Sequence, residues 1–491
     1  MAEAVAAFYA VETVVEGAAV GAVAVARSTA PLHLSFRKIR SPAKGRELAR
    51  SGHTVNIVRG KAYVIGGVGD NGREAAIAAL TLPVASSTAG EGTLNPQDFQ
   101  VVRPEYRVLD RPLAEKPQPS DEQISQDEIF CRVGHSSTAI DDKLFITGGE
   151  SVATGGSTHS LEKFVVFDTL TNGYSVLEAD ISSCVDGIPP PRTNHSATVS
   201  PLPPANSLPG GPTLDAHGTI FIHGGRSTGS EAGETLRDTW AFDIGTRAWA
   251  KLPDIPDPGP LEIAGEGRIV YRNDRLWRLG DGFGRVMYLD LNKANSAGTG
   301  SQISVALKDG VCWEVVNFGT EVTDGESQGT SSAPTTNQPV SLPLPRVSSG
   351  TVPITTGSGR EYLIYFMGRD SMTGPHDDFW TFQIDAESNT AASVKDKIRD
   401  ALPVDPDSSW KSGRHTWAKC ELVADQQKKI AEEKQETKDT LSEWPPGLYD
   451  FGSDVWADQG RDSFLIWGGK KGGKNSSQGA VVDGGWVVTA K

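Results

Sequence analysis

The chain has 491 residues, of which 37% are hydrophobic, and it contains 54 glycines and 30 prolines. This composition favours many short elements joined by turns, and the length fits either two or three ordinary domains or one large repeat architecture. The formal net charge of −15 argues against a general binder of nucleic acid or of an anionic membrane, because both need a positive surface.

The first 31 residues are rich in Ala and Val, but Glu3, Glu12 and Glu16 interrupt the apolar run and no basic segment precedes it. A secretory signal or a membrane-spanning helix tolerates such charges poorly. We therefore interpret segment 1–31 as soluble, with some helical character. The four cysteines are scattered and show no C-x-x-C spacing, which favours a reduced, cytoplasmic setting.

From residue 50 onward the chain repeats one pattern. In three copies an arginine is followed after two residues by a histidine, then by a short apolar strand, a turn, a second apolar strand and Gly-Gly. A third apolar strand, often ending in Asp, and a fourth strand come next. Four strands recurring six times predict six units, with approximate bounds 50–104, 132–178, 192–253, 264–318, 346–422 and 446–491.

This repeat resembles the kelch repeat. The resemblance rests on the spacing Trp240…Asp243…Trp249 and on the glycine doublets Gly66-Gly67, Gly148-Gly149, Gly224-Gly225 and Gly468-Gly469. It implies an all-β fold, a six-bladed kelch-type β-propeller that occupies residues 32–491 as a single domain, with seven blades as the alternative. In such a fold four-stranded sheets stack radially and bury both faces.

The last repeat ends at the C-terminus without a fourth strand. Residues 33–39, HLSFRKI, can supply it, and we predict that they close the ring and abolish a free sheet edge. Polar stretches near 110–128, 320–342 and 424–443 interrupt the repeats and are predicted to be flexible insertions, of which the third contains good helix formers, as does 391–402.

Arginines recur where the innermost strand of four repeats begins, at Arg50, Arg132, Arg192 and Arg346. In a propeller these strand starts converge on one mouth of the central channel, where several guanidiniums would suit a carboxylate or phosphate. The resemblance adds that kelch proteins holding acidic peptides use related arginines on that face. The alternative is that each arginine pairs with a carboxylate or carbonyl of its own blade.

The histidines are divided by their place in the repeat. His53, His135 and His195 occupy equivalent positions, which indicates a scaffold role. His223 precedes a glycine doublet without a counterpart in the other repeats. It is therefore either a satisfied core residue or a fifth candidate for the ligand site at the channel mouth.

Plant specifier proteins, which share the kelch fold, hold Fe(II) through Glu, three residues, Asp, three residues and His. Glu234 and Asp238 have this spacing, but Phe242 stands at the histidine position. The two acids are thus weak candidates for an iron site, and we expect no cofactor.

Two functions remain open. The chain is either a binding or scaffold protein that holds a protein partner or a small acidic ligand at the channel mouth, or an accessory, specifier-like enzyme of secondary metabolism that directs isomerisation, cyclisation or breakdown of a reactive intermediate. The second reading rests on similarity to filamentous-fungal kelch proteins labelled by analogy with specifiers. We favour the binding role, with no nucleic acid and no membrane as partner.

Overall fold

A computed structural model describes residues 31–41, 48–69, 77–82, 99–102, 104–106, 129–151, 157–158, 161–184, 186–201, 217–228, 233–256, 266–280, 282, 284–291, 311–316, 342–370, 373–387, 390–401, 414–422, 445–457, 462–472 and 479–490. The predicted N-terminal segment 1–31 and the predicted insertions near 110–128, 320–342 and 424–443 lie outside these residues, apart from residues 31 and 342.

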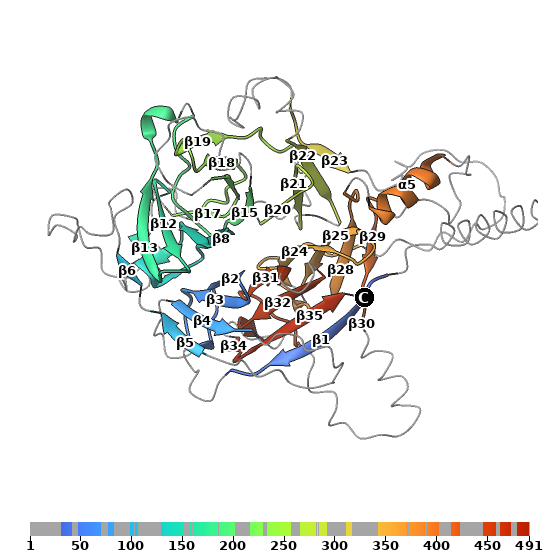
Figure 1. The fold of residues 1–491 in the computed structure, drawn as a ribbon, viewed down its shortest axis with the longest axis horizontal. Coiled ribbons are helices and arrows are strands. Elements are labelled where there is room, and N and C mark those ends of the chain that lie inside the picture. Colours follow the sequence, from blue (N-terminus) through green and yellow to red (C-terminus); the bar gives the residue numbers. More distant parts are fainter. Residues whose placement is uncertain are drawn as a thin grey trace, which may run out of the picture.

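Six small antiparallel sheets surround a central axis and form a six-bladed β-propeller, as the sequence predicted (Figure 1). The innermost strands of blades 1 to 6 are β2 (Thr54–Val58), β8 (Ser136–Ile140), β15 (Ser196–Ser200), β20 (Arg268–Arg272), β24 (Gly350–Thr355) and β31 (Gly452–Val455). The second strands are β3 (Lys61–Ile65), β9 (Lys143–Thr147), β16 (Thr219–His223), β21 (Arg275–Leu279), β25 (Glu361–Phe366) and β32 (Ser463–Trp467).

The third strands are β4 (Ile77–Thr81), β12 (Lys163–Asp168), β18 (Thr239–Asp243), β22 (Val286–Asp290), β28 (Phe379–Gln383) and β35 (Gly485–Ala490). The outer strands are β5 (Phe99–Val102), β13 (Gly173–Glu178), β19 (Ala248–Lys251), β23 (Glu314–Val316), β29 (Trp417–Lys419) and, in blade 6, β1 (His33–Ile39). A turn of 3₁₀ helix at Ile181–Ser183 follows β13.

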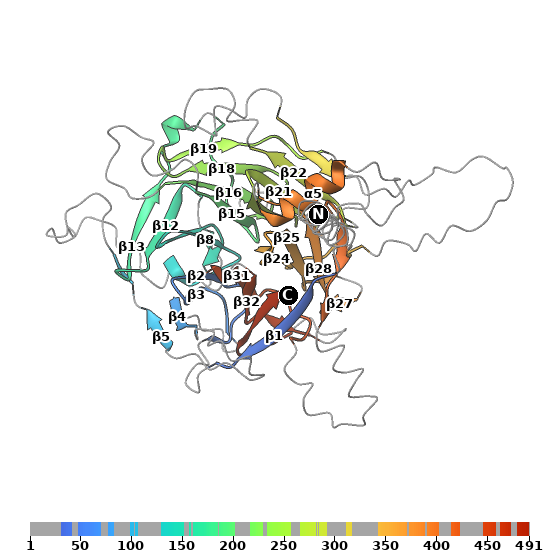
Figure 2. The ribbon, with the colours of Figure 1, turned by 45° about the vertical axis from the view of Figure 1, so that its right-hand side comes forward.

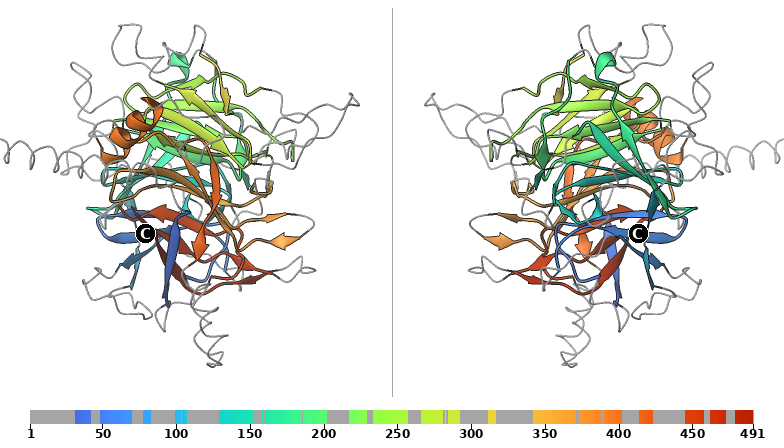
Figure 3. Two further views of the ribbon diagram at one scale, coloured as in Figure 1. Left: turned by 90° about the vertical axis from the view of Figure 1, so that its right-hand side faces the viewer. Right: turned by 90° about the vertical axis from the view of Figure 1, so that its left-hand side faces the viewer.

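The N-terminal strand closes the ring. β1 pairs antiparallel with β35 from Leu34 opposite Ala490 to Ile39 opposite Gly485, so the predicted closure by residues 33–39 is confirmed. In the side views the blue β1 lies beside the red strands of blade 6 (Figure 3).

Two short strands tie neighbouring blades together at the outer edge. β30 (Glu421–Leu422) leaves blade 5 and pairs parallel with β1, and β6 (Glu105–Tyr106) leaves blade 1 and pairs parallel with β13 of blade 2. The remaining short strands pair with one another beyond the ends of the second strands: β7 (Arg132–Val133), β10 (Glu150–Ser151), β11 (Ser157–Thr158), β14 (Arg192–Thr193), β17 (Arg226–Ser227), β26 (Arg369–Asp370), β27 (Gly374–Pro375), β33 (Lys470–Lys471) and β34 (Ala480–Val481).

The hydrophobic core is divided into six clusters, and each cluster fills the seam between two adjacent blades. In the seam between blades 2 and 3, Trp249 stacks on Phe164 with ring centroids 5.7 Å apart, and its indole N–H donates to the Leu161 carbonyl at 3.1 Å. This arrangement explains why the second and third strands are apolar on both faces.

The glycine doublets allow the backbones of adjacent blades to approach closely. Gly148 has φ +66°, and a Cβ atom there would lie 2.6 Å from Cε1 of His195 in the next blade. The Asp that ends a third strand caps the following turn, since Asp243 accepts from the Thr246 amide at 2.9 Å. Both roles follow from the repeat pattern.

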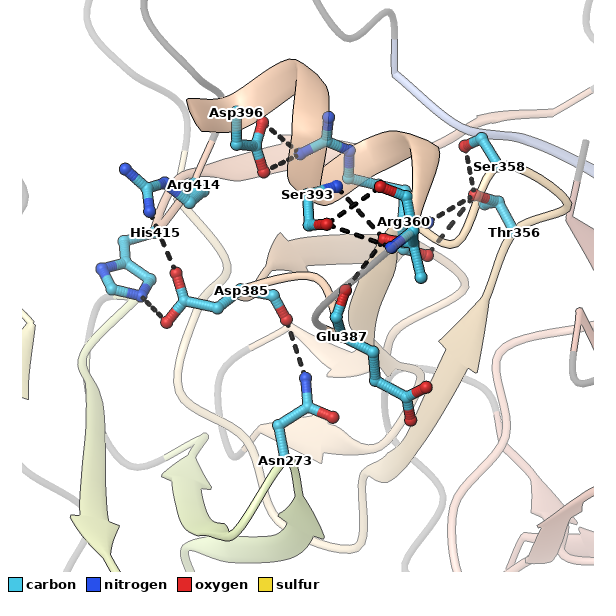
Figure 4. A network of polar contacts seen from close by, with 11 residues as sticks. Asn273, Thr356, Ser358, Arg360, Asp385, Glu387, Ser393, Asp396, Arg414 and His415 are labelled. Atoms are coloured by element: carbon cyan, nitrogen blue, oxygen red, sulfur yellow. Dashed lines mark hydrogen bonds and ion pairs between the residues drawn. The ribbon is translucent and has the colours of Figure 1, made fainter. Parts of the chain in front are cut away.

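One α-helix, α5 (Ala391–Ala401), is described after the third strand of blade 5, where helix formers predicted it. Thr390 and Ser393 exchange hydrogen bonds at its N-terminus, each side chain accepting from the other's amide at 3.1 Å. The buried Arg360 donates to both oxygens of the buried Asp396 at 2.7 and 2.6 Å, which fastens the helix to blade 5 (Figure 4). Within the described chain no helix has the length and apolar character needed to span a bilayer.

Candidate functional site

The six innermost strands surround a central cavity of about 890 Å³. It lies where these strands begin, and their first two residues line it in every blade, for example Thr54 and Val55 of β2 or Arg268 and Ile269 of β20. The strands gather around the axis in the rotated view (Figure 2). A volume of this size suits a small molecule or the end of a peptide.

A chain of backbone hydrogen bonds links four blades beside the cavity. The Gly52 amide donates to the Asp450 carbonyl at 2.8 Å, the Gly134 amide donates to Gly52 at 3.3 Å, and the Asn194 amide donates to Gly134 at 2.7 Å. The backbones of blades 6, 1, 2 and 3 therefore meet here. The hydroxyl of Ser348 in blade 5 donates to the Asp450 carboxylate at 2.7 Å and extends the contact to a fifth blade.

Charged side chains of both signs line this cavity. Four are cationic and three are anionic: Arg226, Arg268, Arg369 and Lys470, and Glu150, Glu266 and Asp450. Several of them come from equivalent positions, because the residue that follows the glycine doublet is Glu150 in blade 2, Arg226 in blade 3 and Lys470 in blade 6. The four cations stand out on a chain whose formal net charge is −15.

Three of the cations differ in their environments. Arg226 is 54% exposed and reaches the Glu266 carboxylate at 3.3 Å. The guanidinium of Arg369 lies over the Tyr449 ring, 4.6 Å from its centroid. Burial lowers the pKa of Arg268, and the nearby charges of Glu266 and Asp450 act in the opposite direction; a guanidinium keeps its charge under such a shift.

The four predicted arginines lie elsewhere. Arg50, Arg132, Arg192 and Arg346 are 0–2% exposed, and none is among the described residues that line the cavity. Each donates to a carbonyl at the end of the second strand of its own blade, as Arg50 does to Gly66 at 3.0 Å and Arg132 does to Gly148 at 3.1 Å. These contacts match the alternative in which the arginines serve their own blades, while their predicted ligand role stays a prediction.

Two of these arginines also form ion pairs, in which the guanidinium is fully buried and the carboxylate is partly exposed. Arg192 holds both oxygens of Asp238 at 2.7 and 2.8 Å, and the indole of Trp240 donates to the same carboxylate at 2.7 Å. Arg346, Asp378 and Trp380 repeat this arrangement in blade 5. In contrast, Arg132 donates to the backbone carbonyls of Ile129 and Gly148, and burial lowers its pKa to about 9.

Glu234 and Asp238, the two weak candidates for an iron site, have different environments. Asp238 is held by Arg192, whose hydrogen bonds and charge, against the opposing effect of burial, keep the pKa of the carboxyl below its usual value. Glu234 is exposed, and Phe242 is fully buried in the seam between blades 2 and 3. Over the described residues no group of three or more His, Cys, Asp or Glu side chains is arranged to hold a metal ion.

The three equivalent histidines join successive blades. His53 donates to the Trp467 carbonyl of blade 6 at 3.1 Å, and His195 bonds the Ser136 hydroxyl of blade 2 at 2.8 Å. His135 makes the matching bond to Thr54 of blade 1 at 3.0 Å. Their positions indicate the scaffold role that the repeat predicted.

His223 is fully buried between blades 3 and 4 and is not among the described lining residues. Its Nε2 accepts from Nε of Arg278 at 2.8 Å, so its Nδ1–H donates to the Thr239 hydroxyl at 2.8 Å. Burial, with the charges of Arg278 and Arg192, lowers its pKa well below 6.5. It is therefore a neutral residue with both nitrogens satisfied.

The sequence contained a signal for the cations that do line the cavity. The residue after each of the four glycine doublets lines the channel mouth and is Val68, Glu150, Arg226 or Lys470. In blade 5, where the doublet is replaced by Met367-Gly368, the equivalent residue is Arg369. Arg268 could have been found as the large charged residue at the first position of an inner strand, where the other blades have Thr, Ser or Gly.

Comparison with known proteins gives one partial match. Tip elongation aberrant protein 3 of Schizosaccharomyces pombe is 29% identical over an alignment 149 residues long, and the match covers 25% of this chain and 11% of that protein. The chain thus matches only a small part of the relative's length. No family model matches the chain.

Proposed function

We propose that the protein is a kelch-type propeller that binds an acidic ligand, either a segment of a protein partner or a small molecule, at the mouth of its central cavity. The six-bladed ring supports a scaffold or binding role. The glycine doublets, the Asp that caps the third strand and the tryptophan in the seam support the kelch type.

The observation that carries the proposal is the placing of four cations around one cavity. Arg226, Arg268, Arg369 and Lys470 come from blades 3, 4, 5 and 6, and all four line the same space. Cations in a concave, partly desolvated site attract anions more strongly than the same charges on an open surface. Arginine adds a planar fork that matches a carboxylate.

Charge reversal at the mouth tests the proposal. We expect a fluorescein-labelled glutamate-rich peptide to bind with an anisotropy change, and Arg226→Glu with Arg369→Glu to weaken binding by about tenfold or more, because two attractions become repulsions. Binding should also weaken as salt is raised. The matched control is Lys61→Glu, an exposed charge at the start of β3, at the other end of the blade from the cavity.

If the Arg226→Glu, Arg369→Glu double variant and the Lys61→Glu control bound the peptide with equal affinity, the proposed site would be contradicted. Failure of the wild-type protein to bind any acidic probe, including short dicarboxylic acids, would contradict the function itself.

A cytoplasmic location belongs to the same proposal. It is supported by the state of the four cysteines, none of which is in a disulfide. The alternative of an accessory enzyme stays a prediction, and the metabolites that accumulate in a deletion strain would test it.

A further inference from the structure

On the wall of the cavity, three polar atoms of blades 4 and 5 have no hydrogen-bond partner within the described part of the chain. They are Nε of Arg268, Oγ of Ser349 and Oγ1 of Thr351, and all three atoms are buried. Arg268 begins the inner strand of blade 4, and the two hydroxyls flank the start of the inner strand of blade 5, which is its neighbour in the ring. All three residues line the cavity.

Such atoms are uncommon in a folded protein because an unsatisfied buried donor costs free energy. The hydroxyls in blades 1 and 2 illustrate the ordinary case. The side chain of Thr54 bonds His135 at 3.0 Å, and that of Ser136 bonds His195 at 2.8 Å. In each contact the histidine stands just before the inner strand of the next blade. That position is Gly267 in blade 4, Ser349 in blade 5 and Phe451 in blade 6, so no equivalent histidine is available to Arg268 or Thr351.

Two glycines beside these residues are closely packed. A Cβ atom on Gly267 would lie 2.7 Å from the guanidinium carbon of Arg278, and one on Gly350 would lie 2.4 Å from the Phe366 ring. At the strand position of Arg268 the other five blades have Thr54, Ser136, Ser196, Gly350 and Gly452.

We propose that Arg268, Ser349 and Thr351 form a subsite for a single carboxylate group. This inference rests on the proposed function and names the chemical group that enters deepest. A guanidinium edge and two hydroxyls offer donors to the two oxygens of a carboxylate.

The neighbouring acids set the charge that the subsite accepts. Glu266 is paired with Arg226 at 3.3 Å, and Asp450 accepts from Ser348 at 2.7 Å. Both acids lie close enough to Arg268 for their charges to act on its pKa. A monoanion gains the attraction of Arg268 with the least repulsion, so the subsite favours a carboxylate over a phosphate dianion.

Thermal shift and calorimetry with acetate, propionate and inorganic phosphate, in chloride-free buffer at equal ionic strength, test the subsite. We expect the carboxylates to stabilise the wild-type protein more than phosphate does. Arg268→Gln, Ser349→Ala and Thr351→Val should each reduce the association constant for propionate, Arg268→Gln by about tenfold or more. The matched controls are Lys61→Gln and Ser358→Ala, on exposed side chains away from the cavity.

A second readout separates binding from folding. If the two hydroxyls are unsatisfied in the free protein, Ser349→Ala and Thr351→Val should melt no lower than the Ser358→Ala control without ligand. A marked loss of stability in both would show that these hydroxyls serve the fold and would overturn the subsite.

The other outcomes are also decisive. Carboxylate binding that is unchanged in Arg268→Gln, or phosphate binding as tight as propionate binding, overturns the subsite. If the glutamate-rich peptide still binds and Arg226→Glu still weakens it, the proposed function survives that failure. If neither probe binds, both fall.

Discussion

At the scale of the residue, the arginines that recur in four repeats are buried inside their own blades and do not line the cavity. Arg192 and Arg346 each donate to a backbone carbonyl just after the second strand of their own blade. Each also pairs with an aspartate, and that aspartate accepts a hydrogen bond from a tryptophan of the same blade. The two guanidiniums are fully buried, the aspartates are 18% and 19% exposed, and each pair links the end of the second strand to the start of the third. The spacing of the arginines was readable, but the direction of their side chains was not.

Removing one partner of such a pair leaves a buried charge without compensation. We expect Asp238→Asn to lower the free energy of unfolding by about 3–5 kcal/mol, measured by urea denaturation. Asp254→Asn, in an ion pair where Asp254 is 76% exposed, should cost less than about 1 kcal/mol. A stability of Asp238→Asn equal to that of this control would show that Arg192 does not need its carboxylate.

The inter-blade histidines give stability a defined pH dependence. Burial and the charges of Arg192 and Arg268 lower the pKa of His195 to about 3, and burial and Arg50 lower that of His53 to about 3 as well. In the unfolded chain a histidine titrates near pH 6.5. Below that pH the unfolded state binds more protons, so folding stability is full above about pH 6.5 and falls as the pH drops toward 3.

Each histidine should contribute a slope of up to about 1.4 kcal/mol per pH unit between these limits. His195→Gln should therefore flatten the decline between pH 6 and pH 4, measured by urea denaturation at a series of pH values. Ser358→Ala, on an exposed side chain without a titratable group, is the control and should leave the slope unchanged. An identical slope in His195→Gln and wild type would mean that His195 is protonated in the folded protein.

At the scale of the element, β1 completes a sheet whose other strands come from the far end of the sequence. Leu34 and Ile39 are 0% exposed, and they enter the seams of blade 6 with blades 5 and 1 respectively. β30 and β6 also join segments from different blades, because β30 pairs with β1 of blade 6 and β6 pairs with β13 of blade 2. These two-residue strands were not predicted, since nothing in so short a run distinguishes a strand from a loop.

Truncating a buried side chain of β1 should weaken the whole ring. We expect Leu34→Ala to lower the free energy of unfolding by about 2–5 kcal/mol through the cavity it leaves. Hydrogen exchange in residues 485–490, which pair with β1, should become faster. Lys38→Ala on the same strand is the control, and a Leu34→Ala protein as stable as this control would show that the strand is dispensable.

At the scale of the whole molecule, the repeat determined most of what could be predicted. The glycine doublets, the terminal aspartates and the apolar strands predicted six sheets, because local backbone geometry requires these residues at these places. The missing fourth strand of the last repeat predicted the closure. The binding surface was harder to predict. Whether an arginine such as Arg50 or one such as Arg226 faces the axis depends on strand register and on the neighbouring blade, which one repeat does not encode.

Blade 4 shows the same limit from the other side. Its degenerate sequence gave no arginine before the inner strand and no histidine, and it placed Arg268 and Glu266 on the cavity instead. A departure from the repeat is therefore more informative about function than the repeat itself, which mainly reports how the blades pack.

The register of the closing pair has a mechanical consequence. Leu34 lies opposite Ala490, so the start of β1 and the end of β35 leave the sheet at the same edge. A force that pulls residues 33 and 490 apart loads this antiparallel pair in peeling geometry, and its bridges break one after another instead of sharing the load. The β1–β35 pairing that completes the propeller is thus also the place where tension would open it first.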